Sequence, residues 1–382
     1  MSAGVSRRRL GQIAGLTSAA TLASACGIGE APPAERALPY TGGNPWGVNT
    51  FLHKEVEFWK KDLSLQMIRD AGIGWIKQQF PWEEIEQPRK GQYWDTKYSQ
   101  ATWTKFDELV ALAEQHNLRV IARLDRPPAW ARSDQEHHSR PPDDFDDFGD
   151  FVATTVDRYR GRVEYFQIWN EPNLGAEWTG RVDPAAYADL LRIAHTRAKE
   201  ANPNAVVLCA PLAINLEQGP LNLNELDYLG LLYAAGAQPY FDIMLANAYG
   251  MDRPPSEPAS TDTLNFQRVR LLHEVMARHG DGEKAVWFNE YGWNASPPTL
   301  PPEQLIWRRV TDQQQAEWTV EGVLHARREW PWVGAIMIWY FRQVGDITPA
   351  QSEYYFRMVE PDFTPRPVYF TVKRAATAQR GW

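Results

Sequence analysis

The sequence predicts an α/β protein built as a single (β/α)8 barrel, the TIM-barrel fold. From residue 46 onward, short apolar runs alternate with longer amphipathic segments, and the alternation occurs eight times. No Gly-x-Gly-x-x-Gly turn follows an early strand, which argues against an open dinucleotide-binding sheet. The 382 residues would allow two ordinary domains, but barrels of this kind routinely exceed about 250 residues in one domain. We therefore expect residues 46–382 to form one barrel.

Eight short segments are the expected strands. Each is a run of four to eight residues rich in Val, Ile and aromatic side chains, as is typical of parallel strands buried on both faces. They are Trp46–Phe51, Trp75–Phe80, Arg119–Leu124, Glu164–Trp169, Ala205–Ala210, Asp242–Ala246, Ala285–Asn289 and Gly334–Trp339.

Helical periodicity separates these strands. It is clearest over Thr104–Asn117, Pro184–Asn202 and Asp312–Trp330, where apolar residues recur every three or four positions. Asp183-Pro184 is a typical helix start, with a capping side chain followed by proline at the first helical position. The loops after the fifth, sixth and seventh strands are rich in proline and lie on the face where barrels bind ligands.

Residues 1–25 predict an export signal. Arg7–Arg9 are positively charged, residues 10–22 are mildly apolar, and Ala23-Ser24-Ala25 fits the small-residue cleavage site. Ser6-Arg7-Arg8 resembles a twin-arginine signal, although the usual Phe is missing. We expect a bacterial exported protein, either secreted or held at the cell surface.

Cys26 directly follows the expected cleavage site, which resembles a lipoprotein box in which Leu22 lies one place further from the cysteine than usual. Acylation of Cys26 would tether the protein to a membrane, and residues 26–45, rich in Pro, Gly and Ala, would form the tether. The alternative is plain secretion, with Cys26 an incidental first residue.

Composition excludes several classes of protein. A net charge of −8 argues against a nucleic-acid-binding surface. The sequence contains no run of 18 apolar residues, so no membrane span is predicted. Two cysteines cannot form a disulfide framework, and Cys209, in an apolar run, is expected to be a small buried residue. The 17 tryptophans indicate a ligand with flat apolar faces. We expect a monomer.

Two glutamates carry the strongest chemical signal. Glu171 follows the fourth strand in Gln167-Ile-Trp-Asn-Glu-Pro-Asn173, and Glu290 follows the seventh in Val286-Trp-Phe-Asn-Glu-Tyr-Gly292. Polar residues at strand ends point into the mouth of a barrel, and these two strands face each other across it. Two carboxylates that flank an acetal can cleave a glycosidic bond, provided that one of them stays protonated in a poorly solvated setting. Trp169, Trp287 and Trp293 would supply that setting.

The motif Trp169-Asn-Glu-Pro-Asn173 resembles the strand-4 signature of the (β/α)8 retaining glycoside hydrolase clan, clan A. The run Ile168–Leu174 is most similar to glycoside hydrolase family 39 and the related bacterial exopolysaccharide glycosidases. Trp75-Ile-Lys-Gln-Gln-Phe-Pro-Trp82, with Ile85-Glu86 and Gly91-Gln-Tyr-Trp94, is similar to the strand-2 region of that group. The resemblance extends over residues 46–345.

The resemblance implies a role for each matching residue. Glu171 matches the general acid/base, and Glu290 matches the nucleophile of a retaining double displacement. Asn170 matches the residue that binds the sugar 2-hydroxyl, Tyr249 matches a tyrosine that orients the nucleophile, and Trp339 matches an aromatic platform under the sugar.

Other residues are candidates for the substrate subsites, and the sequence departs from the group at two of them. Lys77 stands where relatives commonly have Arg, and Asn247 where they commonly have His; lysine offers a point charge in place of a bidentate fork. Arg123 and Asp125 would contact substrate or pair with each other. Outer sugar platforms or loop packing would account equally well for Trp82, Trp130, Trp178 and Trp293.

No cofactor is expected. His137-His138 lies in an acidic loop typical of a solvated turn, and no His-Glu-x-x-His or Cys-x-x-Cys spacing predicts a metal site. The expected activity is therefore hydrolysis of a poly- or oligosaccharide, with endo action favoured. The alternatives are an exo-acting enzyme such as a β-xylosidase, a glycan-binding barrel without catalysis, and an aldolase or isomerase that uses Lys77 in a Schiff base.

Overall fold

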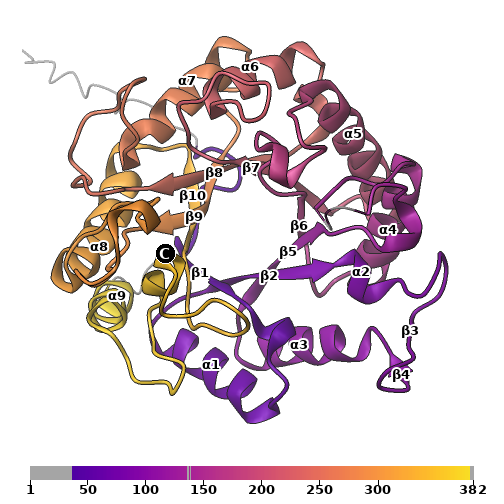
Figure 1. Cartoon of the computed structure of the whole chain (residues 1–382), viewed down its shortest axis with the longest axis horizontal. Coiled ribbons are helices and arrows are strands. Elements are labelled where there is room, and N and C mark those ends of the chain that lie inside the picture. The colour runs from indigo at the N-terminus through magenta and orange to yellow at the C-terminus, as the bar shows by residue number, and fades with distance from the viewer. Residues whose placement is uncertain (1–36, 136, 138, 379–382) are drawn as a thin grey trace, which may run out of the picture. The chain divides into compact units, whose positions relative to one another are not determined.

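The computed structural model describes residues 37–135, 137 and 139–378. The expected signal peptide and Cys26 lie outside these residues. The described chain forms a closed barrel of eight parallel strands whose order around the barrel is β1-β10-β9-β8-β7-β6-β5-β2 (Figure 1). The predicted fold class is therefore confirmed.

All eight expected strands are present, with ends that differ from the predictions by at most three residues. They are β1 (Trp46–Thr50), β2 (Trp75–Pro81), β5 (Arg119–Asp125), β6 (Tyr165–Ile168), β7 (Val206–Leu212), β8 (Ile243–Tyr249), β9 (Val286–Gly292) and β10 (Val333–Ile338).

An outer ring of helices surrounds the barrel (Figure 1). Its members in the described part of the chain are α1 (Phe58–Asp70), α3 (Thr104–Gln115), α4 (Phe145–Arg158), α5 (Pro184–Ala201), α6 (Glu225–Ala234), α7 (Val269–Arg278), α8 (Asp312–Glu329) and α9 (Pro367–Ala378). The three helices expected from periodicity are α3, α5 and α8. Asp183 caps α5 as predicted, since its carboxylate accepts a hydrogen bond from the backbone N–H of Ala186 at 3.0 Å.

The connection between β2 and α3 carries extra structure that the sequence did not predict. It contains the short helix α2 (Trp82–Ile85) and a small hairpin of β3 (Trp94–Asp95) and β4 (Gln100–Ala101). The hairpin projects from the rim of the barrel (Figure 1).

The barrel interior is layered, with an aromatic plug below and polar side chains above. Trp75, Tyr165 and Trp287 contact one another with ring centroids 4.9–5.1 Å apart. Two positions further along each strand, Lys77, Gln167 and Asn289 are also buried. Because inward positions recur every second residue, the strands that place the plug also place this polar layer.

Gly47 shows how tightly the interior is filled. A Cβ atom at this position would lie 2.3 Å from the sulfur of Met337, so the absence of a side chain on β1 lets Met337 of β10 fill the lumen.

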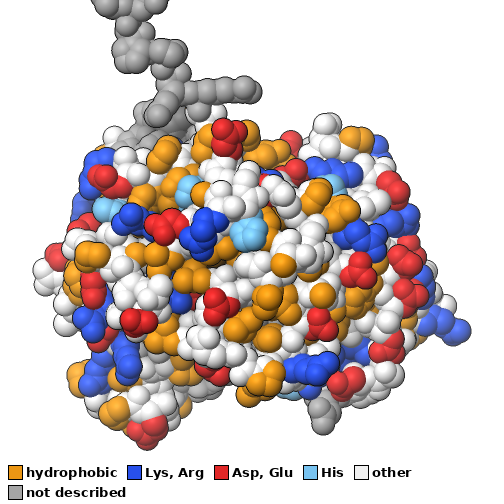
Figure 2. Space-filling view, turned by 90° about the horizontal axis from the view of Figure 1, so that it is seen from above, with side chains coloured by type: hydrophobic (Ala, Val, Ile, Leu, Met, Phe, Trp, Pro, Cys, Tyr) orange, Lys and Arg blue, Asp and Glu red, His pale blue; other side chains and the backbone are white. Residues whose placement is uncertain are grey.

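No helix of the described residues is long and apolar enough to cross a membrane. On the face seen in Figure 2, Lys and Arg side chains are interspersed with Asp and Glu, and neither sign of charge forms a continuous patch.

Candidate active site

Glu171 lies on a strained turn at the end of β6. Trp169 and Glu171 have φ of 71° and 44°, a left-handed conformation that costs energy for residues other than glycine. Neighbouring strands hold the turn, since the N–H of Trp169 donates to the carbonyl of Leu124 and the N–H of Glu171 to that of Pro211, both at 3.0 Å. The turn therefore places Asn170 and Glu171 at the mouth of the barrel.

The other residues of the motif fix this turn from below. Trp169 is buried, and its indole N–H donates to the carbonyl of Glu177 at 2.8 Å. The buried Asn173 side chain donates to the carbonyls of Ala213 and Leu223, both at 2.8 Å. The motif thus combines two residues that face the mouth with two that hold the loop.

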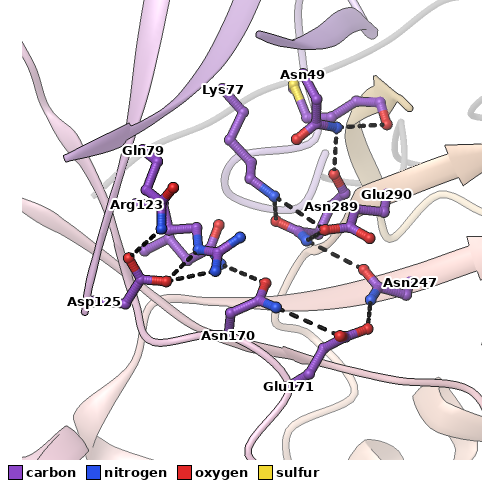
Figure 3. A network of polar contacts seen from close by, with 12 residues as sticks. Asn49, Lys77, Gln79, Arg123, Asp125, Asn170, Glu171, Asn247, Asn289 and Glu290 are labelled. Atoms are coloured by element: carbon purple, nitrogen blue, oxygen red, sulfur yellow. Dashed lines mark hydrogen bonds and ion pairs between the residues drawn. The ribbon is translucent and has the colours of Figure 1, made fainter. Parts of the chain in front are cut away.

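Glu290 owes its orientation to a bulge in β9. Ala246 of β8 pairs with Phe288, but the next residue, Asn247, pairs with Glu290, so Asn289 is skipped. An extra residue in a strand re-aims the side chains around it. As a result the consecutive residues Asn289 and Glu290 both direct polar atoms to the same cluster (Figure 3), where regular alternation would have separated them.

The Glu290 carboxylate has three polar neighbours. Its Oε2 accepts a hydrogen bond from the Tyr249 hydroxyl at 2.7 Å. Its Oε1 lies 3.7 Å from Nζ of Lys77 and 3.5 Å from Nδ2 of Asn289. These contacts come from β2, from β8 and from the adjacent residue of β9, and they hold the carboxyl group in place.

Two asparagine side chains connect Glu290 with Glu171 (Figure 3). Lys77 Nζ donates to Asn289 Oδ1 at 2.7 Å, Asn289 Nδ2 donates to Asn247 Oδ1 at 3.1 Å, and Asn247 Nδ2 donates to Glu171 Oε1 at 2.5 Å. We call the two side chains Asn289 and Asn247 the amide relay. It brings residues from β2, β8, β9 and the β6 turn into one network.

The direction of the relay is set from the Lys77 end. The ammonium form of Lys77 can only donate, so Asn289 turns its oxygen to Lys77 and its NH2 to Glu290 and Asn247. Asn247 then turns its oxygen to Asn289 and its NH2 to Glu171. The relay therefore presents a hydrogen-bond donor to Oε1 of Glu171.

The surroundings of the Glu171 carboxyl raise its pKa. Removal of the Glu171 carboxyl from water raises its pKa to about 8, and the negative charges of Glu290 and Glu177 act in the same direction. The hydrogen bond from Asn247 opposes this rise, because it favours the carboxylate. At neutral pH, Glu171 is therefore mostly protonated and can give up a proton.

Burial also acts on Lys77. It lowers the pKa of the Lys77 ammonium to about 7, although the nearby charge of Glu290 opposes the change.

The structure places the remaining predicted residues at different distances from this network. Asn170 Nδ2 lies 3.5 Å from Glu171 Oε2. Trp339, at the end of β10, is partly exposed and packs edge-on against Phe51 with ring centroids 5.6 Å apart.

Arg123 forms an ion pair with Asp125 at 2.5 Å, so the pairing left open by the sequence is present. Gln79 also donates to Asp125 at 2.8 Å.

For Trp82 and Trp293 the structure shows the packing alternative and not the sugar platform. Trp82 is 0% exposed and stacks on Phe151, while its indole N–H donates to Glu86. Trp293 is 1% exposed, packs against Tyr291, and donates to the carbonyl of Arg253. Neither ring has a free face for a sugar, and the same holds for Trp178, which is fully buried. Trp130 is partly exposed.

Several residues of the site were not predicted. Asn289 and Gln167 had a sequence signal, since each is a polar residue within an otherwise apolar strand. Trp307 had no sequence signal. It lies in the loop after β9, is partly exposed, and packs near Tyr249 with ring centroids 5.9 Å apart. Among the described residues, no group of three or more His, Cys, Asp or Glu side chains is arranged to hold a metal ion.

We expect the titration of Glu171 to report on the amide relay. In Asn289→Ala, Asn247 loses the donor to its oxygen and can turn that oxygen toward Glu171, which favours the protonated carboxyl. The Glu171 titration, followed by NMR of ¹³C-labelled glutamate, should move upward from about 8 by roughly 0.5–1 pH unit, the size of one hydrogen bond. Asn247→Ala should move it similarly, and the double variant no further.

Two variants control this experiment. Glu171→Gln removes the signal and so assigns it. Asn204→Ala makes the same chemical change at an exposed position and should leave the titration unchanged. An unmoved titration in Asn289→Ala, together with a moved one in Asn247→Ala, would show that Asn289 does not orient Asn247.

Comparison with known proteins places this cluster in a family context. The family model for cellulases, glycosyl hydrolase family 5, matches residues 40–211, a span that contains Glu171 but not Glu290. None of the curated protein sequences matches the chain.

Several solved structures share the fold. A family 39 glycoside hydrolase from the gut symbiont Bacteroides cellulosilyticus WH2 has 20% sequence identity and a TM-score of 0.66, over 88% of this chain and 64% of its own. The family 39 enzyme from Xanthomonas axonopodis pv. citri has 16% identity and a TM-score of 0.62, over 87% and 67%. A family 5, subfamily 18 protein from Streptomyces cattleya, solved in complex with Manβ1-4GlcNAc, has 15% identity and a TM-score of 0.64, over 89% and 81%.

The chain therefore spans just under two thirds of the length of the first of these structures. At such low identities the likeness establishes the barrel fold, and the family 5 match adds support for a glycosyl hydrolase. The resemblance to the clan A glycoside hydrolases, first drawn from Trp169–Asn173, is confirmed.

Proposed function

We propose that this protein is a retaining glycoside hydrolase that cleaves O-glycosidic bonds in a poly- or oligosaccharide by double displacement. The observation that carries the proposal is the cluster of Glu171 and Glu290, which come from separate strands and are joined by the amide relay. Glu171 is the acid/base and Glu290 the nucleophile. The raised pKa of Glu171 supports this division of roles.

In the first step, a carboxylate oxygen of Glu290 attacks the anomeric carbon while Glu171 gives its proton to the departing glycosidic oxygen. The bond from the anomeric carbon to that oxygen breaks, and a covalent ester to Glu290 forms. Tyr249 and Lys77 lie beside the Glu290 carboxylate and hold it in place for the attack.

In the second step, Glu171 is a carboxylate and removes a proton from water. The water oxygen attacks the anomeric carbon, and Glu290 leaves as the carboxylate, so the sugar keeps its original configuration. The donor that the amide relay presents to Oε1 of Glu171 stabilises the carboxylate present between the two steps. Retaining enzymes that use this mechanism have their two carboxyl groups about 5–5.5 Å apart.

The remaining site residues would recognise the sugar. Asn170, adjacent to Glu171, would bind the 2-hydroxyl, and the partly exposed ring of Trp339 would support the sugar face. Lys77 and Asn247 are directed to the two glutamates. These are the two positions that depart from the family pattern, and we therefore propose that both residues act in catalysis rather than in sugar specificity.

We expect Glu171→Gln and Glu290→Gln each to lower turnover of an aryl glycoside by about a thousandfold or more, because each removes a reacting group. The panel should contain several aryl sugars, since the sugar is not known. Azide should restore turnover in Glu171→Ala when the leaving group is dinitrophenolate, because that group departs without a proton.

Glu303→Gln, a change of the same kind at an exposed position, is the matched control. Full activity in either glutamine variant would refute the assignment. Measurable affinity for glycans without hydrolysis of any substrate would instead indicate a binding barrel.

The burial of Lys77 favours a second candidate, an aldolase or isomerase that forms a Schiff base. A lysine with a pKa of about 7 is a good amine nucleophile. Its Nζ, however, is engaged by Asn289 at 2.7 Å. Trapping with borohydride and a carbonyl substrate would distinguish the two, since only a Schiff base becomes covalently fixed to Lys77.

We propose endo action, in which internal bonds of the polymer are cut. The product sizes from a soluble polysaccharide test this directly. An endo-acting enzyme should lower the viscosity of the solution well before much reducing sugar appears, and should release a range of oligosaccharides. Release of only single sugars from the start would indicate an exo-acting enzyme such as a β-xylosidase.

We also propose export, with acylation of Cys26. In a bacterial host fed labelled palmitate, the full chain should incorporate label and partition with membranes, whereas Cys26→Ser should do neither. Cys209→Ala is the control, because it removes the chain's other cysteine, which is buried in the barrel wall. Unlabelled, soluble wild-type protein outside the cell would indicate plain secretion.

A further inference from the structure

A second concave site lies on the rim of the barrel beside the candidate active site. It is a pocket of about 580 Å³ formed by the loop after β1, the loop after α2, the β3–β4 hairpin and the first turn of α3. Its lining includes His53, Val56, Gln87, Tyr98, Gln100 and Thr104. None of these residues belongs to the catalytic network.

The charged side chains around this pocket largely neutralise one another. Lys61 pairs with Glu108 at 2.7 Å, and Lys105 pairs with Glu84. Glu55 pairs with Arg342 at 2.5 Å. Asp95 is occupied within the hairpin, where its carboxylate accepts from the N–H groups of Lys97 and Tyr98. Lys54 is the exception, since it also lines the pocket and has no ion pair among the described residues. A ligand of this pocket therefore meets one uncompensated cation, while the other charges are paired.

His53 contributes a hydrogen-bond donor of fixed orientation. The Gln78 oxygen accepts from the N–H of Leu52 and from the Thr50 hydroxyl, both at 3.0 Å, so the Gln78 NH2 must donate to Nδ1 of His53 at 2.6 Å. The imidazole is then neutral, with its proton on Nε2. His53 is 7% exposed, and Nε2 has no hydrogen-bond partner within the described part of the chain.

Tyr98 gives the pocket an aromatic wall. Its side chain is 62% exposed, although it lines the pocket, and the Lys97 ammonium lies 4.9 Å from its ring centre. Trp94, on the same hairpin, is 51% exposed. Large exposed rings on one hairpin indicate a binding surface, and a sugar ring has the apolar face and hydroxyl edge that suit Tyr98 and Nε2 of His53.

The pocket is close to the catalytic network. Its loops follow β1 and β2. Asn49 of β1 donates to the backbone carbonyl of Asn289 at 2.9 Å, and Lys77 of β2 donates to the side chain of the same residue. Gln78, which orients His53, is the neighbour of Lys77 in β2. The charge of Arg123 is near enough to lower the pKa of His53.

We propose that this pocket is a distal binding site for neutral sugar units of the polysaccharide whose bond lies between Glu171 and Glu290, a proposal that rests on the proposed function. Tyr98 stacks on a sugar face, and Nε2 of His53 donates to a hydroxyl. The site holds the polymer away from the scissile bond, so it serves long substrates and not short ones.

The test compares binding and turnover in Tyr98→Ala, Tyr98→Phe and Phe370→Ala. Phe370 is a matched control, an exposed aromatic on α9 outside the pocket. Affinity electrophoresis through gels containing hydroxyethylcellulose, glucomannan or arabinoxylan measures binding, with polygalacturonate as the acidic comparison. Turnover is measured on the same neutral polymers and on an aryl glycoside.

We expect Tyr98→Ala to weaken retardation by the neutral polymer that the wild type binds and to raise its KM about tenfold. The kcat and the aryl glycoside activity should stay unchanged. Tyr98→Phe, which keeps the ring, and Phe370→Ala should match the wild type. Unfolding temperatures would show that all variants are folded.

Two results would overturn the inference. One is unchanged binding and KM in Tyr98→Ala, and the other is a wild type that none of the neutral polymers retards. Failure of the proposed function has a different signature, in which the wild type is retarded through Tyr98 but hydrolyses neither polymer nor aryl glycoside.

Discussion

The site depends on one constraint: two carboxyl groups at the same barrel mouth cannot both be ionised there without compensation. Glu290 has the Lys77 amino group and a hydroxyl donor as neighbours, whereas Glu171 has amide donors and the nearby charge of Glu290. Burial and that charge raise the pKa of Glu171 to about 8, so this carboxyl is mostly protonated at neutral pH. Residues from β2, β8 and β9 thus give two chemically identical side chains different polar neighbours.

The barrel supplies this arrangement through two local departures from regular geometry. The left-handed turn at Trp169 and Glu171 places a carboxyl over the barrel without extending β6, and the bulge at Asn289 turns two consecutive side chains of β9 inward. Both distortions are held by neighbouring strands. The strained conformations persist at these points because the surrounding sheet is closed and tightly filled.

Much of the fold follows from sequence because apolar runs such as Val206–Leu212 must be strands buried on both faces. The two glutamates could also be found, since each follows such a run. The bulge could not, because hydrophobic alternation does not show that Asn289 is skipped in the pairing. The roles of Trp82 and Trp293 stayed open because a tryptophan has the same composition signal in a core as in a sugar platform. Only the packing of Phe151 and Tyr291 distinguishes the two cases.

Asn247 distinguishes this site from those of the resembling enzymes, which commonly have histidine at this position. A histidine side chain can itself titrate near neutral pH. An asparagine cannot, so the protonation of Glu171 in this protein is governed by its burial and by Glu290, with the amide contributing only a donor of fixed direction. That direction is in turn set by Lys77, through Asn289. The two departures from the family pattern are thus linked, because the amide at residue 247 is oriented only if residue 77 supplies a donor to residue 289.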